Sequence, residues 1–170
     1  MARYINMNTV NGNLEEVIGL SSSTGPSDSN KIVETDSTGR IDQSMMPVGV
    51  GADTKSIEAS ENLASGDFVN VWNDVGTVKI RKADASTAGK EVTGFVLDAV
   101  TSGLNGLVYF ENTNTGLTGL TLGDTYFLST TPGAVSNTAA NGSGNVVQKV
   151  GVALSTTEIA FEPTQTITLA

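Results

Sequence analysis

Cysteine and histidine are both missing from this chain of 170 residues. Without cysteine there is no disulfide scaffold and no thiol nucleophile, and without either residue there is no zinc or iron site built on soft ligands. The lack of histidine also excludes catalysis by a Ser-His-Asp triad. We therefore expect no cofactor and no metal site, and carboxylates are the side chains left that could carry catalysis.

Charged residues are scarce as well, at 16% of the chain against about 25% in an average soluble domain. Their balance is acidic, with a formal net charge of -9. Nucleic acids and anionic membrane surfaces are bound through clustered lysine and arginine, so we expect neither as a partner. Uncharged polar residues fill the surface instead, which suits packing against other protein.

Basic residues cluster at one place only, formed by Lys79, Arg81 and Lys82. The period of a β-strand places Lys79 and Arg81 on one face, opposite Val78 and Ile80. This pattern indicates a solvated strand face, or alternatively a contact with an acidic protein partner.

Long apolar runs are also missing. No segment approaches the roughly 20 apolar residues that span a bilayer. The N-terminus lacks the basic start and apolar run of a signal peptide. We expect a protein that is synthesised in a cytoplasm and does not enter a membrane.

Aromatic residues are almost absent from the first third of the chain, where Tyr4 stands alone. The others are Phe68, Trp72, Phe95, Tyr109, Phe110, Tyr126, Phe127 and Phe161. Because large rings dominate core energetics, the core is expected from about residue 60 onward. The sequence therefore predicts two parts, an extended N-terminal arm over residues 1–60 and a folded domain over residues 61–170.

The second part contains an internal repeat. The segments that begin Gly66-Asp67 and Gly123-Asp124 lie 57 residues apart, and each is followed by a second glycine at the same spacing, Gly76 or Gly133. At the same offset Gly94-Phe95-Val96-Leu97 matches Gly151-Val152-Ala153-Leu154. After a shorter loop in the second copy, residues 108–113 match residues 159–164. The pseudo-repeats cover about residues 62–115 and 119–168.

Each copy has the pattern of short strands joined by turns. Apolar side chains alternate with period two, as at Val69 and Val71 or Tyr126 and Leu128, which is typical of half-buried antiparallel strands. Hairpin turns are expected at residues 73–76 and 130–133. The predicted fold class is all-β, a small antiparallel β-barrel or sandwich of about eight strands, with the strand order left open.

The arm is expected to form one hairpin and little else. Asn11-Gly12 lies between two short apolar strands, the strongest short hairpin signal, and residues 21–30 have linker composition. Isolated apolar residues then occur in an otherwise polar segment. They are expected to contact another protein, or alternatively to fold back on their own domain as a strand or cap. The candidate contact residues are Tyr4, Ile5, Ile32, Val33, Ile41, Met45, Met46, Pro47 and Val48. The adjacent methionines suit docking because methionine adapts to irregular grooves.

Motifs that could carry chemistry are weak. Residues 49–56 resemble a phosphate loop only superficially, because the Gly-Lys-Ser/Thr ending is missing. Residues 36–39, Asp-Ser-Thr-Gly, indicate a turn, as do Asn141-Gly142-Ser143. Asp67 and Asp124 occupy matching positions and could form a carboxylate pair, but each is expected to accept backbone N–H bonds in its own turn.

Several segments resemble one family. "KIVETDSTGRIDQSMMPVGVGADT" is similar to a segment near the N-termini of tailed-phage structural proteins. "ENLASGDFVNVWN", "GKEVTGFVLDAV", "GDTYFLSTTPGAVS" and "GNVVQKVGVAL" look like the β-rich body of phage head decoration (cement) proteins and related head-fibre proteins.

The resemblance implies a virion structural protein, not an enzyme, which binds the outer surface of the capsid through its arm and stabilises contacts between capsomers. Its partner would be the major capsid protein, and it would be a homo-oligomer, with a trimer favoured and a dimer possible. The alternative is a head-fibre or tail-fibre module that binds host receptors or glycans. An enzyme built on carboxylates ranks last.

Overall fold

The computed structural model describes residues 3–8, 10–37, 39–46 and 53–170. Across these ranges the chain forms β-strands and two short 3₁₀ turns, with no α-helix. It divides into two compact units, Met1–Gly51 and Ala52–Ala170, called here the arm unit and the β-domain. The all-β prediction is therefore confirmed.

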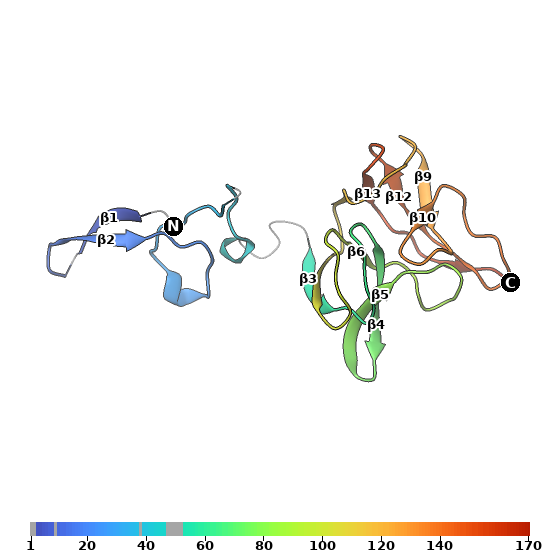
Figure 1. Ribbon diagram of the computed structural model, residues 1–170, viewed down its shortest axis with the longest axis horizontal. Coiled ribbons are helices and arrows are strands. Elements are labelled where there is room, and N and C mark those ends of the chain that lie inside the picture. Colours follow the sequence, from blue (N-terminus) through green and yellow to red (C-terminus); the bar gives the residue numbers. More distant parts are fainter. Residues whose placement is uncertain (1–2, 9, 38, 47–52) are drawn as a thin grey trace. The chain divides into compact units, whose positions relative to one another are not determined.

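The arm unit begins with the predicted hairpin (Figure 1). Strands β1 (Arg3–Met7) and β2 (Leu14–Ile18) pair antiparallel. The loop between them is closed by a hydrogen bond from the Gly12 N–H to the Asn8 carbonyl (2.8 Å), with Gly12 at φ 72°, in the left-handed region that favours glycine.

The segment expected to be a linker folds back on the end of the hairpin instead. Leu20 and Val33 form an isolated parallel bridge, with hydrogen bonds from the Leu20 N–H to the Ile32 carbonyl (2.8 Å) and from the Glu34 N–H to the Leu20 carbonyl (3.0 Å). The 3₁₀ turn η1 (Pro26–Asp28) lies inside this loop, and η2 (Gln43–Met45) follows later.

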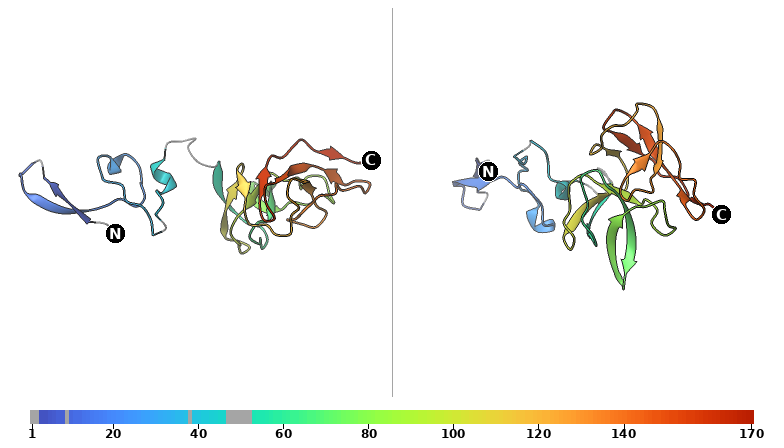
Figure 2. Two further views of the ribbon diagram at one scale, coloured as in Figure 1. Left: turned by 90° about the horizontal axis from the view of Figure 1, so that it is seen from above. Right: turned by 45° about the vertical axis from the view of Figure 1, so that its right-hand side comes forward.

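The β-domain is built from two five-stranded sheets and one two-stranded sheet (Figures 1 and 2). The first sheet has the order β3-β7-β6-β4-β5, from β3 (Thr54–Glu58), β4 (Phe68–Asp74), β5 (Thr77–Lys82), β6 (Gly94–Val96) and β7 (Asn105–Tyr109). The second has the order β10-β9-β12-β13-β8, from β8 (Thr113–Asn114), β9 (Thr125–Leu128), β10 (Val135–Ser136), β12 (Lys149–Ala153) and β13 (Ile159–Phe161). The third pairs β11 (Val146–Val147) with β14 (Ile167–Thr168).

The two large sheets repeat one another strand for strand. Strands β4, β5, β6 and β7 correspond to β9, β10, β12 and β13, and β3 and β8 occupy the same edge of their sheets. The turns that enter β4 and β9 also match, because Gly66 and Gly123 have φ values of 83° and 81°. In both turns the aspartate N–H, of Asp67 or Asp124, bonds the carbonyl three residues earlier at 3.2 Å. The sequence repeat therefore corresponds to a repeat in strand order.

The core lies in the β-domain, as the distribution of aromatic residues predicted. One apolar cluster is lined by both large sheets and contains Phe68 and Phe95 from the first and Phe161 from the second. The Phe161 ring centroid lies 6.0 Å from that of Phe68 and 5.4 Å from that of Phe95. A second cluster, which includes Val69, lies within the first sheet. Shared aromatic packing thus ties the two repeats together.

The structure differs from the expectation in the boundary and the strand count. The division falls between Gly51 and Ala52 rather than at residue 60, because β3 pairs with β7 along its full length. Four strands of two residues bring the number in the described part of the β-domain to twelve, from β3 to β14. Both five-stranded sheets are open, although an isolated parallel bridge between Ala59 and Ile80 links the chain after β3 to β5.

Candidate functional site

The matching carboxylates of the repeat, Asp67 and Asp124, contact different partners. The Asp67 carboxylate accepts the Ala64 N–H (2.8 Å), as expected, and pairs with Lys82 at 3.3 Å. The Asp124 carboxylate accepts a hydrogen bond from the Asn137 side-chain amide (3.3 Å) rather than from a backbone N–H of its own turn.

Among the described residues no group of three or more acidic, histidine or cysteine side chains could hold a metal ion. None of the described helices is both long and apolar enough to cross a bilayer.

The weak motifs have structural explanations where they are described. Asp36 accepts the Arg40 N–H through its side chain at 3.0 Å and the Gly39 N–H through its carbonyl at 3.0 Å, so this segment is a turn as predicted. Residues 54–56 belong to β3, so no helix follows the supposed phosphate loop.

The basic cluster of β5 is paired within the β-domain. The Lys79 ammonium binds the carboxylates of Glu58 (3.1 Å) and Asp74 (3.2 Å). These hydrogen bonds raise the pKa of Lys79, and the bond with Glu58 has the largest effect. The Arg81 guanidinium lies 4.6 Å from the centre of the Trp72 ring and donates to Asn70 at 3.0 Å. Lys79 and Arg81 share one strand face, as predicted. Lys79 is paired with two carboxylates, whereas Arg81 contacts neutral groups only among the interactions of the described residues.

One face of the arm hairpin is apolar and uncovered. In the β1–β2 register Ile5 lies opposite Glu16 and Met7 opposite Leu14, while Ile18 lies opposite Arg3. Directly opposed residues of an antiparallel pair project to the same side. The exposed fractions are 72% for Ile5, 59% for Met7, 74% for Leu14 and 49% for Ile18. We call these four side chains the hairpin apolar face.

The only charges on this face neutralise one another. Arg3 donates to Glu16 at 3.0 Å in an exposed ion pair. The face therefore has no net charge, and apolar side chains dominate it. A surface of this kind is suited to an apolar partner surface rather than to an ionic one.

The opposite face of the hairpin is directed at the arm unit itself. Tyr4 and Val17 lie opposite each other and are both half-buried. The Tyr4 hydroxyl oxygen accepts the Ile32 N–H at 3.3 Å. Tyr4 thus contributes to the internal structure of the arm unit, although the sequence suggested it as a contact residue.

The arm unit has no core of its own among its described residues, because no side chain there is buried. Nine of the sixteen strongly exposed large apolar side chains in the described structure lie before residue 47. Of the candidates proposed from sequence, Ile5, Ile32, Val33, Ile41 and Met46 are exposed and Tyr4 and Met45 are half-buried. Pro47 and Val48 lie outside the described residues.

Sequence reasoning did not select Met7, Leu14 and Ile18 as contact residues. The signal was present, because Ile5 and Met7 on one strand and Leu14 and Ile18 on the other recur at even spacing. That period puts them on one face of a strand. The pairing of the two strands was needed to bring the two sets together.

No protein-family model and no curated protein matches the chain.

Proposed function

We propose that this protein is a virion structural protein, a decoration (cement) protein that binds the outer surface of a tailed-phage head. The observation that carries the proposal is the pairing of a well-packed β-domain with an arm unit whose apolar side chains are exposed. A unit of that kind gains its stabilising burial from a surface outside the chain. The resemblance of residues 31–54 to phage structural proteins supports the outer surface of the phage capsid as that surface.

The proposed mechanism is physical. Burial of the hairpin apolar face and of neighbouring exposed residues such as Ile32 and Ile41 would add contact area across the seams between capsomers. Each large apolar side chain that becomes fully covered contributes about 1.5–3 kcal/mol before the cost of ordering is subtracted. The net charge of -9 opposes nonspecific clustering of the free protein in solution.

The expected partner is the major capsid protein, and the expected location is the capsid exterior, after synthesis in the host cytoplasm. We also propose a homo-oligomer, with a trimer favoured over a dimer. The two repeats share one aromatic cluster, so the β-domain is a stable body that could occupy a fixed position on the capsid lattice. We infer that the two repeats pack as two layers.

A sedimentation experiment with capsids assembled without this protein tests the proposal. The full chain should co-sediment with the capsids, and a fragment of residues 52–170 should stay in the supernatant. A variant with Ile5, Met7, Leu14 and Ile18 each changed to serine should bind at least about tenfold more weakly, since loss of about 1.4 kcal/mol has that effect.

The β-domain offers a matched control. Four of its side chains are also large, apolar and exposed, and their change to serine should leave capsid binding intact; they are Leu104 (61%), Leu107 (43%), Leu122 (67%) and Leu154 (52%). Binding that is lost in the control and kept in the hairpin variant would contradict the proposal. Quantitative mass spectrometry of purified virions gives a second test, because a cement protein should approach the copy number of the major capsid protein.

A further inference from the structure

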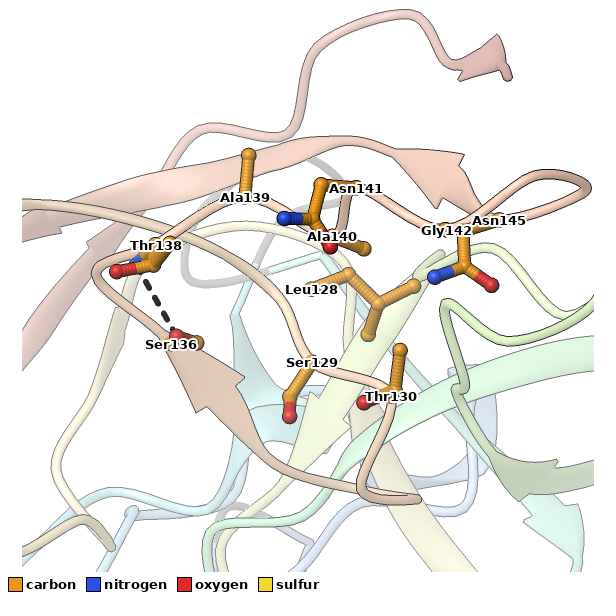
Figure 3. A pocket seen from close by; sticks show the side chains of 10 residues that line it. All are labelled: Leu128, Ser129, Thr130, Ser136, Thr138, Ala139, Ala140, Asn141, Gly142 and Asn145. Atoms are coloured by element: carbon orange, nitrogen blue, oxygen red, sulfur yellow. Dashed lines mark hydrogen bonds between the residues drawn. The ribbon is translucent and has the colours of Figure 1, made fainter. Parts of the chain in front are cut away.

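A hollow of about 320 Å³ lies on the β-domain, well removed in sequence from the arm unit (Figure 3). It is enclosed by the β9–β10 hairpin and by the loop that runs from β10 to β11. Its lining consists of Leu128, Ser129, Thr130, Ser136, Thr138, Ala139, Ala140, Asn141, Gly142 and Asn145. The volume lies at the lower end of the range of ligand sites, roughly 300–1,000 Å³.

Hydrogen bonds hold the walls of this pocket in place. The Asn145 N–H bonds the Gly142 carbonyl at 3.0 Å, and the Leu169 N–H bonds the Asn145 carbonyl at 2.9 Å. On the other wall the Ser129 N–H bonds the Ala134 carbonyl at 3.1 Å. The pocket is therefore formed before any ligand arrives, which lowers the cost of binding.

Several polar groups in the pocket are free to meet a ligand. The hydroxyls of Thr130 and Thr138 and the amides of Asn141 and Asn145 have no hydrogen-bond partner within the described chain. In Figure 3 they surround the hollow together with Ser129 and Ser136. Hydroxyls and primary amides both donate and accept, so this set can bond a ligand that does the same.

Gly142 makes room for one of these groups. A Cβ at residue 142 would lie 2.8 Å from the Asn145 side-chain nitrogen, closer than real contacts allow. The glycine therefore permits the half-buried Asn145 amide to keep its position at the pocket.

The lining contains no charged and no aromatic residue. A phosphate or carboxylate would find no cation there, and a metal ion would find no carboxylate. Ala140 adds a small apolar surface beside the polar groups, next to Asn141 and Leu128 in Figure 3. A neutral ligand of modest size, rich in hydroxyls and with a methyl or C–H face, fits this combination.

We propose that this pocket binds a single neutral sugar unit of a glycan. The Thr130 and Thr138 hydroxyls and the Asn141 and Asn145 amides bond the sugar hydroxyls, and the C–H face or acetamido methyl lies against Ala140. Without an aromatic platform the affinity for one unit is weak, with a Kd in the millimolar range. Many copies on one particle would convert this into strong attachment to a glycan-covered surface.

The test is a titration of the full chain, labelled with ¹⁵N and observed by NMR. The probes are glucose, galactose, mannose, N-acetylglucosamine and N-acetylgalactosamine, each added to high millimolar concentration. At least one sugar should shift amide signals confined to residues 128–145.

Two variants and one control make the result specific. Thr130→Val and Asn145→Leu should each weaken sugar binding at least about tenfold. Thr125→Val, a change at an exposed position of strand β9 that does not line the pocket, should leave binding unchanged. No shift of the pocket amides with any of the sugars overturns the proposal, as does binding that survives both variants. The experiment needs no capsid, so its failure would leave the role of the arm unit standing.

Discussion

Gly94 and Gly151 occupy equivalent positions in the two repeats, and each faces a backbone carbonyl of the neighbouring strand. A Cβ at Gly94 would lie 2.7 Å from the Tyr109 oxygen, and a Cβ at Gly151 would overlap the Ala160 oxygen. Tyr109 and Ala160 correspond in the repeat as well. The glycines recur because β6 and β12 approach their partner strands too closely for any side chain.

We expect Gly151→Ala to destabilise the β-domain by about 1–3 kcal/mol, because the new methyl forces the paired strands apart. Urea unfolding followed by circular dichroism measures the change. Gly119→Ala is the comparison, because a Cβ at that position would contact no other atom within 4 Å. Its φ of 73° is strained for alanine, so backbone strain alone should cost about 1–2 kcal/mol there. A loss of less than about 1 kcal/mol for Gly151→Ala would refute this account.

Asp28 makes the arm loop sensitive to acid. A salt bridge to Lys31 (2.6 Å) and hydrogen bonds from Thr24 lower the pKa of Asp28 from 3.8 to about 2. A lowered pKa in the folded state contributes stability that is complete above pH 3.8 and is lost as the pH falls through about 2. An NMR titration should therefore show the Asp28 carboxyl titrating near pH 2. A midpoint close to 3.8 would mean that the loop does not hold these bonds in solution.

At the scale of elements, the β4–β5 hairpin contains an unfavourable turn residue. It extends away from the rest of the β-domain (Figure 2), and Val75 at its turn is 98% exposed. Val75 has φ 49° and Gly76 has φ 88°, the conformation for which asparagine-glycine is preferred. A β-branched residue in this region is strained, and nothing in the structure explains the valine.

Val75→Asn should stabilise the β-domain by up to about 1 kcal/mol, because strain is relieved and the exposed side chain gives up no packing. Thermal unfolding should then occur at a higher temperature. Val78→Asn is a suitable comparison, since Val78 is also exposed (55%) but lies in strand β5. A lower melting temperature for Val75→Asn would contradict the assigned turn.

The hairpin β1–β2 shows how an element can be stable and still incomplete. An isolated pair of strands is marginal in water. This one is supported on one side by the Leu20–Val33 bridge and the contact between Tyr4 and Ile32. Its other side keeps four apolar residues exposed, and this exposure is the observation behind the docking role that we propose for it.

At the scale of the whole molecule, the two units should behave independently. The described buried apolar side chains belong to the β-domain, from Ile57 to Phe161. We expect residues 52–170 to fold alone, with a melting temperature within a few degrees of that of the full chain. Both repeats should unfold in one transition, because Phe68, Phe95 and Phe161 pack across them. Two separated transitions in the fragment would show that the repeats are autonomous.

Much of this architecture could be predicted from local sequence. Asn11-Gly12 marked the first hairpin, and Gly66-Asp67 and Gly123-Asp124 marked matching turns because local steric and hydrogen-bond rules act within a few residues. The boundary at residue 60 was misplaced since residues 54–58 carry too few apolar side chains to read as a core strand. Their strand character comes from pairing with β7, which is distant in the chain.

The sequence by itself determined the strands that the two repeats share, the turns between them, the internal repeat and the absence of thiol and imidazole chemistry, because each depends on residue type and short-range spacing. Only the tertiary structure decided which apolar residues remain exposed, how β3 and β8 complete their sheets, and that Thr130 and Asn145 line the same pocket. These outcomes depend on contacts between residues far apart in the chain. Burial and pocket shape are properties of such contacts, and no local pattern encodes them.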